Sequence, residues 1–318
     1  MTGGRSLEAR LIARIRRKAD HPAARGLRDD VARLGDLVMT HDTIAQSVHY
    51  RADDPPESVG WKLVAVNLSD LAAKGADPQA ALLSLAIGDP TKDLAAGEWE
   101  ERFLTGVEAA CESYGLPLVG GDTIALPKGA PRVLGLTAIG RAETAPSRSG
   151  AQAGDTIWLV GTLGDAMAGL ALLEEDEDAA GTLVEAYRRP VPQLAAGRAL
   201  APYAHAMMDV SDGLLLDAQR MAEASGVAMV IDLGALPLSD AFTATRGDDQ
   251  LFAATGGDDY ALLLTASPFD ARNVTTCLPS GTIMTAIGRV EEGAGLRLHD
   301  SNGPVELPER LGHEHRSP

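Results

Sequence analysis

Residues 61–78 read WKLVAVNLSDLAAKGADP, and this stretch decides what kind of fold the chain can form. Its apolar residues recur three and four positions apart, a spacing that predicts a helix over residues 59–75. A short apolar run follows and predicts a strand over residues 80–87. Helix and strand in direct succession are typical of an α/β fold.

The same alternation extends from this stretch toward both ends of the chain. Residues 141–154 interrupt it, because they are rich in Ala, Pro, Ser and Gly without periodicity, which is typical of a connection between domains. We therefore expect two domains, residues 1–145 and 146–318, with only loose structure beyond Asp300. Further strands are predicted at 36–42, 116–119, 132–140, 156–160, 207–210, 227–233, 260–265 and 283–290, and further helices at 7–18, 98–114, 165–173 and 213–225.

The composition restricts the partners that this chain can have. Its 28 basic and 45 acidic residues give a net charge of −17, which opposes binding to nucleic acid or an anionic membrane. No apolar run is long enough to span a bilayer, and the chain does not begin with a signal sequence. Cys111 and Cys277 fit neither a disulfide framework nor a zinc site, so a reducing, cytoplasmic location is expected.

Seven aspartates share one context, the end of an apolar strand or the start of a helix, beside Gly, Ser or Thr. Each one alone is most simply a helix cap or a turn residue. If they meet at one edge of a sheet, their charges repel strongly unless cations lie between them. Hard oxygen ligands without a His or Cys set favour Mg²⁺ or Ca²⁺, which indicates a polyphosphate nucleotide as the ligand. The seven are Asp29, Asp30, Asp42, Asp70, Asp122, Asp209 and Asp212.

No familiar nucleotide-binding fingerprint accompanies these aspartates. The chain has neither GxxxxGK[ST] nor a GxGxxG that opens a helix, which excludes a P-loop and a dinucleotide-binding turn. Gly120 and Gly121, just before Asp122, permit a backbone to approach a phosphate closely, although a turn is the usual explanation of such a pair. If ATP binds, another fold binds it.

The order of the motifs resembles the thiamine-monophosphate kinase family, in the superfamily that also contains aminoimidazole ribonucleotide synthetase, selenophosphate synthetase and a hydrogenase-maturation factor. The NLSDLAA block followed by the SDGL block is specific to the superfamily, and His49–Tyr50 and GGDDY point to the thiamine-phosphate branch. The resemblance covers most of the chain, through GLRDDVA (26–32), THDTIAQSVHY (40–50), WKLVAVNLSDLAAKGADP (61–78), LVGGDT (118–123), SRSGA (147–151), GTLGDAMAGLALL (161–173), DVSDGLLLDAQRMAEASG (209–226) and GGDDYALLL (256–264).

The resemblance implies a mixed α/β fold of two domains, like that of aminoimidazole ribonucleotide synthetase. The N-terminal sheet would pair with its twin in a homodimer, and ATP would lie in the cleft beside the C-terminal domain. The implied Mg²⁺ ligands are Asp30, Thr40, His41, Asp42, Asp70, Asp122, Asp209 and Asp212, with Asp70, Asp122 and Asp212 as catalytic candidates. The implied nucleotide contacts are Gly121, Asp122, Arg148 and Ser211, and the implied thiamine-phosphate contacts are His49, Asp258 and His313.

The implied reaction transfers the γ-phosphoryl group of ATP directly to thiamine phosphate and yields thiamine diphosphate and ADP. Because two anions must meet, catalysis depends on charge neutralisation and in-line positioning. The acceptor phosphate has a second pKa of about 6 and is largely deprotonated at neutral pH. A general base is therefore not required, which agrees with the lack of an obvious Ser–His or Cys–His pair.

Several positions around this site depart from the family. Arg28 replaces a glycine and His41 replaces a threonine, which brings a cation and an imidazole close to the metal ligands. Asp258 is shorter than the usual glutamate, and His313 replaces an aromatic residue over the thiamine ring. Other differences are Ile124–Ala125, where the family has threonine and arginine, and Ala261. Lys62 and Lys74 are interpreted as exposed helix charges, and Trp61 as a core residue.

Two alternatives to the kinase remain open at this point. One is an ATP-dependent synthetase of the same superfamily that activates its substrate by phosphorylation. The other is a protein that binds nucleotide or thiamine phosphate at an altered metal site without transferring phosphate. Formation of thiamine diphosphate separates the first from the kinase, and tight ADP binding without Mg²⁺-dependent ATP consumption identifies the second.

Overall fold

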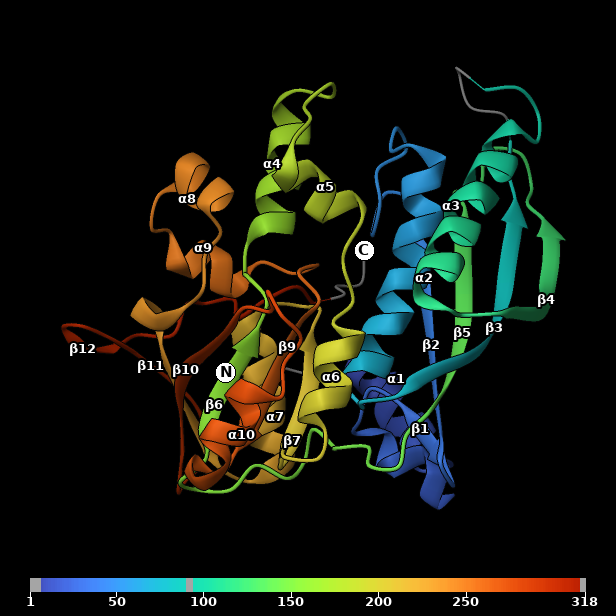
Figure 1. Cartoon of the computed structure of the whole chain (residues 1–318). Coiled ribbons are helices and arrows are strands. Elements are labelled where there is room, and N and C mark those ends of the chain that lie inside the picture. The colour runs from blue at the N-terminus through green and yellow to red at the C-terminus, as the bar shows by residue number, and fades with distance from the viewer. Residues whose placement is uncertain (1–6, 90–93, 315–318) are drawn as a thin grey trace.

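A five-stranded and a seven-stranded sheet form the two halves of the computed structural model, which describes residues 7–89 and 94–314 (Figure 1). The first sheet has the strand order β1-β2-β5-β3-β4, and two long helices cover one of its faces. Elements of this half are α1 (Leu7–Arg16), η1 (Pro22–Leu27), β1 (Ala32–Leu34), β2 (Leu37–Ala45), α2 (Pro56–Ala72), β3 (Asp77–Ile87), α3 (Glu98–Tyr114), β4 (Leu118–Ala125) and β5 (Val133–Arg141).

The second sheet has the strand order β12-β11-β8-β10-β6-β9-β7, with all pairs antiparallel except β11 and β8. Elements of this half are β6 (Thr156–Val160), α4 (Asp165–Glu175), α5 (Thr182–Arg188), α6 (Leu194–Leu200), β7 (Ala206–Val210), α7 (Leu214–Ser225), β8 (Ala228–Asp232), η2 (Leu233–Ala235), α8 (Asp240–Arg246), α9 (Gln250–Thr255), β9 (Ala261–Ala266), η3 (Pro268–Asp270), α10 (Ala271–Thr276), β10 (Met284–Glu291), β11 (Gly295–Asp300) and β12 (Gly303–Val305).

Helix α2 lies between the two halves and is buried along almost its whole length (Figure 1). It has no broad polar face, and a helix that is apolar all round is stable only when it is covered on all sides. One continuous cluster of buried apolar side chains surrounds it and includes Leu68 of α2, Met207 of β7 and Leu264 of β9. The geometry of any site between the halves therefore depends on this helix, because it packs against both of them.

The expected alternation of helix and strand is confirmed, with two local differences. β4 extends to Ala125, so Gly120 and Gly121 lie within a strand and not in a turn. Gly121 has φ +157, and a Cβ there would lie 1.9 Å from the Leu83 carbonyl oxygen of β3. Residues 303–305 form strand β12, contrary to the loose structure expected beyond Asp300. The domain boundary at residue 145 falls between β5 and β6 and stays a prediction.

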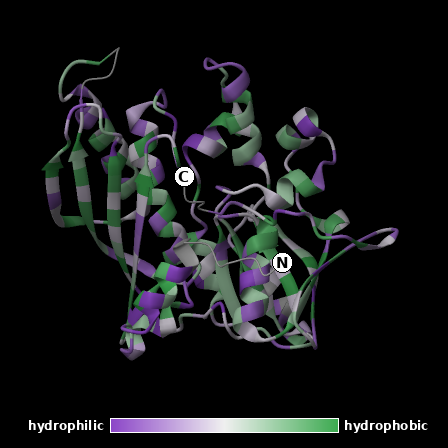
Figure 2. Cartoon of the chain, turned by 180° about the vertical axis from the view of Figure 1, so that it is seen from behind, coloured by the Kyte–Doolittle hydropathy of each residue, from purple (hydrophilic) through white to green (hydrophobic). Residues whose placement is uncertain are grey.

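One face of the first sheet carries no helix among the described residues, as the view from behind in Figure 2 shows. Register places Leu82 of β3, Thr137 of β5 and His41 of β2 in one row of this face. Strand β4 at its edge is exposed at every residue. Apolar side chains exposed on β3, β4 and the start of β5 are Leu82, Ile87, Leu118, Val119, Ile124 and Val133.

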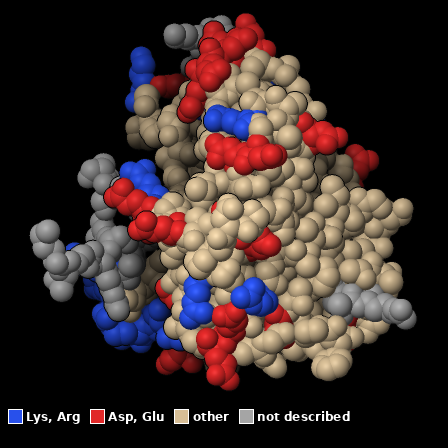
Figure 3. Space-filling view, turned by 90° about the vertical axis from the view of Figure 1, so that its left-hand side faces the viewer, with Lys and Arg blue, Asp and Glu red and all other residues tan. Residues whose placement is uncertain are grey.

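Charge is distributed over the surface in keeping with the net charge of −17. On the face seen in Figure 3, acidic side chains are spread from top to bottom, with basic side chains in small groups between them. Among the described residues, no helix combines the length and the apolar character that crossing a bilayer requires.

The close contact between α2 and α3 yields a stability prediction. Gly106→Ala is expected to lower the free energy of unfolding by about 1–3 kcal/mol, because overpacking of a tight contact costs that much. A Cβ at Gly106 would lie 1.9 Å from the Glu57 carbonyl oxygen, and this clash outweighs the better helix propensity of alanine. Urea unfolding measures the change, with Thr105→Ala on the exposed side of α3 as the control. An unchanged or higher stability of Gly106→Ala would contradict the packing.

Candidate active site

Three carboxylates from distant parts of the chain meet where the two halves join. Asp30 precedes β1, Asp70 lies in α2, and Asp209 lies near the end of β7. Each offers an oxygen atom, and these three atoms lie within 4.8 Å of one another. The convergence expected from the sequence is therefore present for these three aspartates.

Hydroxyl and amide groups hold the carboxylates of α2 and β7 in place. Thr40 of β2 donates a hydrogen bond from its hydroxyl to Asp70, and Ser69 donates to Asp209 at 2.8 Å. The Asn67 side-chain oxygen accepts a hydrogen bond from the backbone N–H of Asp42 at 3.0 Å, which fixes β2 against α2. The polar residues of α2 thus reach both neighbouring strands.

Cations of the chain surround the first pair of aspartates, Asp29 and Asp30. Lys74 Nζ lies 2.6 Å from an oxygen of each. Arg25 forms a second ion pair with Asp29, and Arg148 forms a second ion pair with Asp30. Both aspartates are therefore compensated by charges of the protein itself.

Within residues 7–89 and 94–314, Asp70 and Asp209 on the other side of the cluster form no ion pair with a basic side chain, and their pKa values reflect this. Burial raises the pKa of Asp209 to about 8 and that of Asp42 to about 6, and neighbouring carboxylates add to the effect. Burial followed by the charges of Asp42 and Asp209 raises the pKa of Asp70 well above its usual value. Burial would also raise the pKa of Asp30, but Lys74 and Arg148 outweigh it and hold that pKa below its ordinary range.

The loop after β7 carries Ser211 and Asp212, and a buried aspartate on the following helix shapes it. Asp217 accepts hydrogen bonds at 3.1 Å from the backbone N–H groups of both residues. Arg220 pairs with Asp212 at 2.5 Å and with Asp217 at 2.8 Å. Asp212 is therefore positioned by two residues of α7, five and eight positions further along the chain.

Residues 256–260, which read GGDDY, lie against this loop. The backbone N–H of Asp258 donates to the Ser211 carbonyl at 2.8 Å, and that of Tyr260 donates to the Val210 carbonyl at 2.9 Å. Asp258 and Tyr260 both have positive φ, 68 and 51, which costs free energy for residues with side chains. Lys62 of α2 pairs with the Asp258 carboxylate at 2.7 Å, and the Tyr260 hydroxyl donates to it at 3.0 Å.

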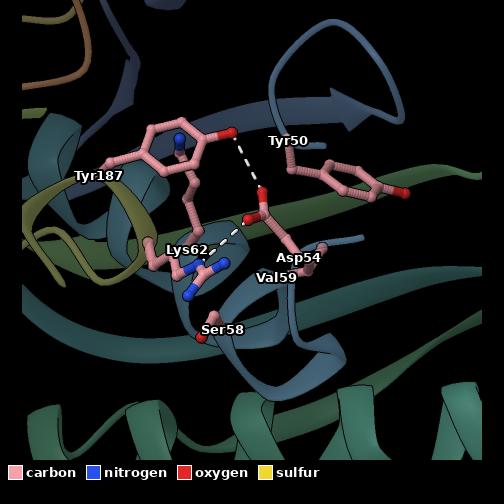
Figure 4. Close-up of a pocket in the computed structure, with 7 residues that line it drawn as sticks. Tyr50, Asp54, Ser58, Val59, Lys62 and Tyr187 are labelled. Carbon is pink, nitrogen blue, oxygen red and sulfur yellow. Dashed lines mark hydrogen bonds and ion pairs between the residues drawn. The ribbon is translucent and has the colours of Figure 1, made fainter. Parts of the chain in front are cut away.

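A narrow pocket beside this ion pair links α2 to α5 (Figure 4). Lys62 Nζ lies 4.1 Å from the centre of the Tyr187 ring, and the Tyr187 hydroxyl donates to Asp54 at 3.1 Å. Arg188 also donates to Asp54. Because side chains of α5 contact Lys62 and Asp54 across this pocket, we interpret it as a structural contact between the halves. Its lining residues are Tyr50, Asp54, Ser58, Val59, Lys62, Tyr187 and Arg188.

The C-terminal segment and the turn after β2 supply two predicted contacts to thiamine phosphate. The backbone N–H of His313 donates to the Asp212 carbonyl at 2.8 Å, so the tail lies directly against the site. His49 accepts a hydrogen bond at its Nδ1 from the backbone N–H of Ala45 at 3.1 Å, which places it at the end of β2.

Three predicted site residues lie away from the carboxylate cluster of their own chain. His41 Nδ1 contacts the Thr137 hydroxyl on the uncovered face of the sheet, opposite to Thr40. Gly121 and Asp122 lie on β4, three strands from β2 and roughly 14 Å away at the usual strand spacing. Asp122 faces the same uncovered side as His41. The row of paired residues runs from Asp122 through Ser84 and Gly135 to Thr43, and Thr43 lies two residues from His41 on the same strand face.

Two lysines that the sequence predicts to be exposed are buried in the structure. Lys62 and Lys74 are 1% and 0% exposed, so the expectation of exposed helix charges is wrong. Both are buried because a carboxylate far away in the sequence neutralises each of them. Arg28, expected near the metal ligands, is exposed, and the cations at Asp30 are Lys74 and Arg148. Trp61 is half-buried against Tyr114, in keeping with a packing role.

The donor set fits a hard divalent cation. Asp70 and Asp209 supply carboxylate oxygens that lie close together, and Thr40 adds a hydroxyl beside Asp70. Asp42 is near enough for its charge to raise the pKa values of both. Crowding of these carboxylates raises their pKa values, and a cation between them would remove that repulsion. The chain therefore offers what Mg²⁺ requires on this side of the cluster.

Comparison with known proteins identifies relatives over most of the chain. The AIR synthase related protein family matches in two parts, its N-terminal domain at residues 28–142 and its C-terminal domain at residues 152–301. Thiamine-monophosphate kinase of Aquifex aeolicus is 38% identical, over 82% of this chain and 83% of the relative. The Escherichia coli K12 protein of that name is 35% identical, over 98% and 97%. A solved structure of AaThiL complexed with AMPPCP and TMP is 33% identical, covers 96% of both chains and has a TM-score of 0.81.

The raised pKa values predict how stability depends on pH without metal. When the pKa of a carboxyl is higher in the folded than in the unfolded protein, the folded state holds more protons at any pH between the two values. The free energy of unfolding therefore falls as pH rises through that window. For Asp209 this window runs from 3.8 to about 8. In a chelator, Asp209→Asn is expected to be more stable than the unsubstituted protein at the alkaline end of the window and equal to it at the acidic end. Thermal unfolding across this window, with exposed Asp36→Asn as the control, measures the difference; a constant difference would contradict the prediction.

Proposed function

Because the chain belongs to the thiamine-monophosphate kinase family of AIR synthase related proteins, we propose that it transfers the γ-phosphoryl group of ATP to thiamine phosphate. The products are thiamine diphosphate and ADP. The observation that carries the proposal at the level of the site is the convergence of Asp30, Asp70 and Asp209 within 4.8 Å. Such a cluster suits a reaction between two phosphate-bearing anions.

We propose Mg²⁺ as the cofactor, held by Asp42, Asp70 and Asp209 with Thr40 beside them. When bound, Mg²⁺ would neutralise the phosphates and the charge that spreads in the transition state. The residues of the chain position these ligands, since Ser69 and Thr40 orient two of the carboxylates by hydrogen bonds. Asp212 is the further ligand proposed at the cluster, since Arg220 pairs with its carboxylate and its backbone N–H donates to Asp217.

The nucleotide would lie along the loop after β7 and beside Arg148, with Ser211 as a further contact. Arg148 already pairs with Asp30 and so lies at the cluster, where its guanidinium can contact a phosphate oxygen. No residue is required to take a proton from the acceptor, because the phosphate of thiamine phosphate is largely ionised at neutral pH.

Asp258, His49 and His313 are the proposed contacts to thiamine phosphate. Asp258 is held in a strained left-handed conformation by Lys62 and Tyr260, so its carboxylate is fixed in position before a ligand arrives. The backbone N–H of His313 donates a hydrogen bond to the carbonyl of Asp212, so the C-terminal segment lies beside this proposed metal ligand.

We further propose a cytoplasmic homodimer in which the uncovered face of the first sheet meets its twin. This face exposes Leu82, Ile124 and neighbouring apolar side chains, and contact with a second copy would bury them. Asp122 and Gly121 lie on the same exposed strand β4, remote from the cluster of their own chain. In the dimer they would act on the nucleotide and metal of the partner subunit.

The first test of this proposal removes one carboxylate of the cluster. Asp70→Asn is expected to lower thiamine diphosphate formation by several orders of magnitude, because it removes a metal ligand, while the fold is retained since repulsion falls. Chromatographic measurement of thiamine diphosphate with purified protein, ATP and Mg²⁺ gives the rate. Asp77→Asn, an exposed aspartate paired with Arg198, is the control and should remain active. Failure of the unsubstituted protein to form thiamine diphosphate would refute the function itself.

Subunit complementation tests the dimer. If Asp122 serves the partner's site, a mixture of Asp70→Asn and Asp122→Asn chains contains heterodimers with one complete site. Refolding the two inactive variants together should restore up to roughly a quarter of the unsubstituted activity, since half of the dimers are mixed and each has one site of two. Each variant refolded alone is the control. A mixture as inactive as its components would place Asp122 outside the partner's site.

A further inference from the structure

Lys74 is the most deeply buried cation at the cluster. It follows the end of α2 and is 0% exposed. Its ammonium group lies 2.6 Å from Asp29 Oδ1, 2.6 Å from Asp30 Oδ2 and 3.0 Å from the Met207 carbonyl oxygen. Three oxygen atoms from two separate parts of the chain therefore surround one positive charge, without access to water.

These contacts divide the aspartates of the site into two sets. Asp29 and Asp30 face three cations, Arg25, Lys74 and Arg148. Asp70 and Asp209 accept hydrogen bonds from the hydroxyls of Thr40 and Ser69, and the structure gives neither a cationic partner within the part of the chain that it describes. The cluster is thus neutralised on one side by the protein and left anionic on the other.

We propose that Lys74 is a built-in cation that occupies, at the Asp29–Asp30 pair, the place that a divalent ion would otherwise take. Metal binding is then confined to the side formed by Asp42, Asp70 and Asp209. This inference rests on the proposed function, because it concerns how many metal ions the same site holds.

The geometry favours an ammonium group over a metal ion at this pair. An oxygen-to-nitrogen distance of 2.6 Å is that of a close ammonium–carboxylate ion pair, whereas Mg²⁺ requires oxygens at about 2.0–2.1 Å in octahedral arrangement. A tethered amine has no dissociation equilibrium, so the Asp29–Asp30 loop stays in position when metal is removed. The bond to Met207 also joins α2 to β7, the strand that carries Asp209.

Lys74 therefore acts as a positioning residue with a defined effect on metal stoichiometry. Without its charge, Asp29 and Asp30 become a second anionic pair next to Asp70 and Asp209. Since an Asp30 oxygen lies within 4.8 Å of theirs, the enlarged set can hold one more divalent ion.

The test counts Mn²⁺ ions bound per chain by electron paramagnetic resonance of the free ion, in the full-length protein. Lys74→Met is expected to bind one more Mn²⁺ per chain than the unsubstituted protein. Arg25→Met is the matched control, because Arg25 pairs with Asp29 and donates to the Ala145 carbonyl at the edge of the cluster, and the Mn²⁺ stoichiometry of this variant should not change. Equal Mn²⁺ numbers in Lys74→Met and the unsubstituted protein would overturn the inference.

A second measurement covers the case in which Lys74→Met folds poorly. Lys74→Gln keeps a hydrogen-bond donor without the charge, and its melting temperature should rise more on addition of Mg²⁺ than that of the unsubstituted protein. An equal rise in both would also overturn the role of Lys74. If the unsubstituted protein binds no Mn²⁺, the proposed metal site fails, an outcome distinct from an unchanged count in the variants.

Discussion

The structure depends on one constraint, the compensation of carboxylates that are buried together. Asp30, Asp70 and Asp209 arise from a loop, a helix and a strand, and their oxygens lie within 4.8 Å of one another. Anions cannot share a buried space of this size unless protons, cations of the protein or metal ions balance them. The raised pKa values of Asp70 and Asp209 and the lowered pKa of Asp30 express this balance within one cluster.

Helix α2 supplies the geometry on which that balance is built. From one buried helix, Asn67 reaches β2, Ser69 reaches Asp209 and Lys62 reaches Asp258. Consecutive helix positions point in different directions, so a helix enclosed on all sides can serve both halves at once. A shift of α2 relative to either half would move metal ligands and substrate contacts together, which explains why close glycine packing against α3 matters to the site as well as to stability.

Much of this arrangement could be predicted from the sequence, but its long-range pairings could not. The periodicity of residues 59–75 locates α2, and the sequence context of Asp30, Asp70 and Asp209 indicates a shared cluster. Strand order, however, is set by contacts between remote segments, and it places Asp122 three strands from β2. Likewise, nothing local to Lys62 identifies Asp258, 196 residues away, as its partner.

The burial of Lys62 and Lys74 could nevertheless have been predicted from the residues around them. An exposed lysine needs a solvated face, yet the polar residues within 61–72 form no broad face and apolar residues stand between them. On a helix of that kind, the charge of Lys62 has no route to water, and the same holds for Lys74 in the turn directly after it. Each must therefore be paired with an acid inside the protein. Since several aspartates are predicted to converge on α2, these aspartates are the acids with which the two lysines are expected to pair. The charge balance of the site therefore depends on Lys62 and Lys74 as well as on the acidic motifs.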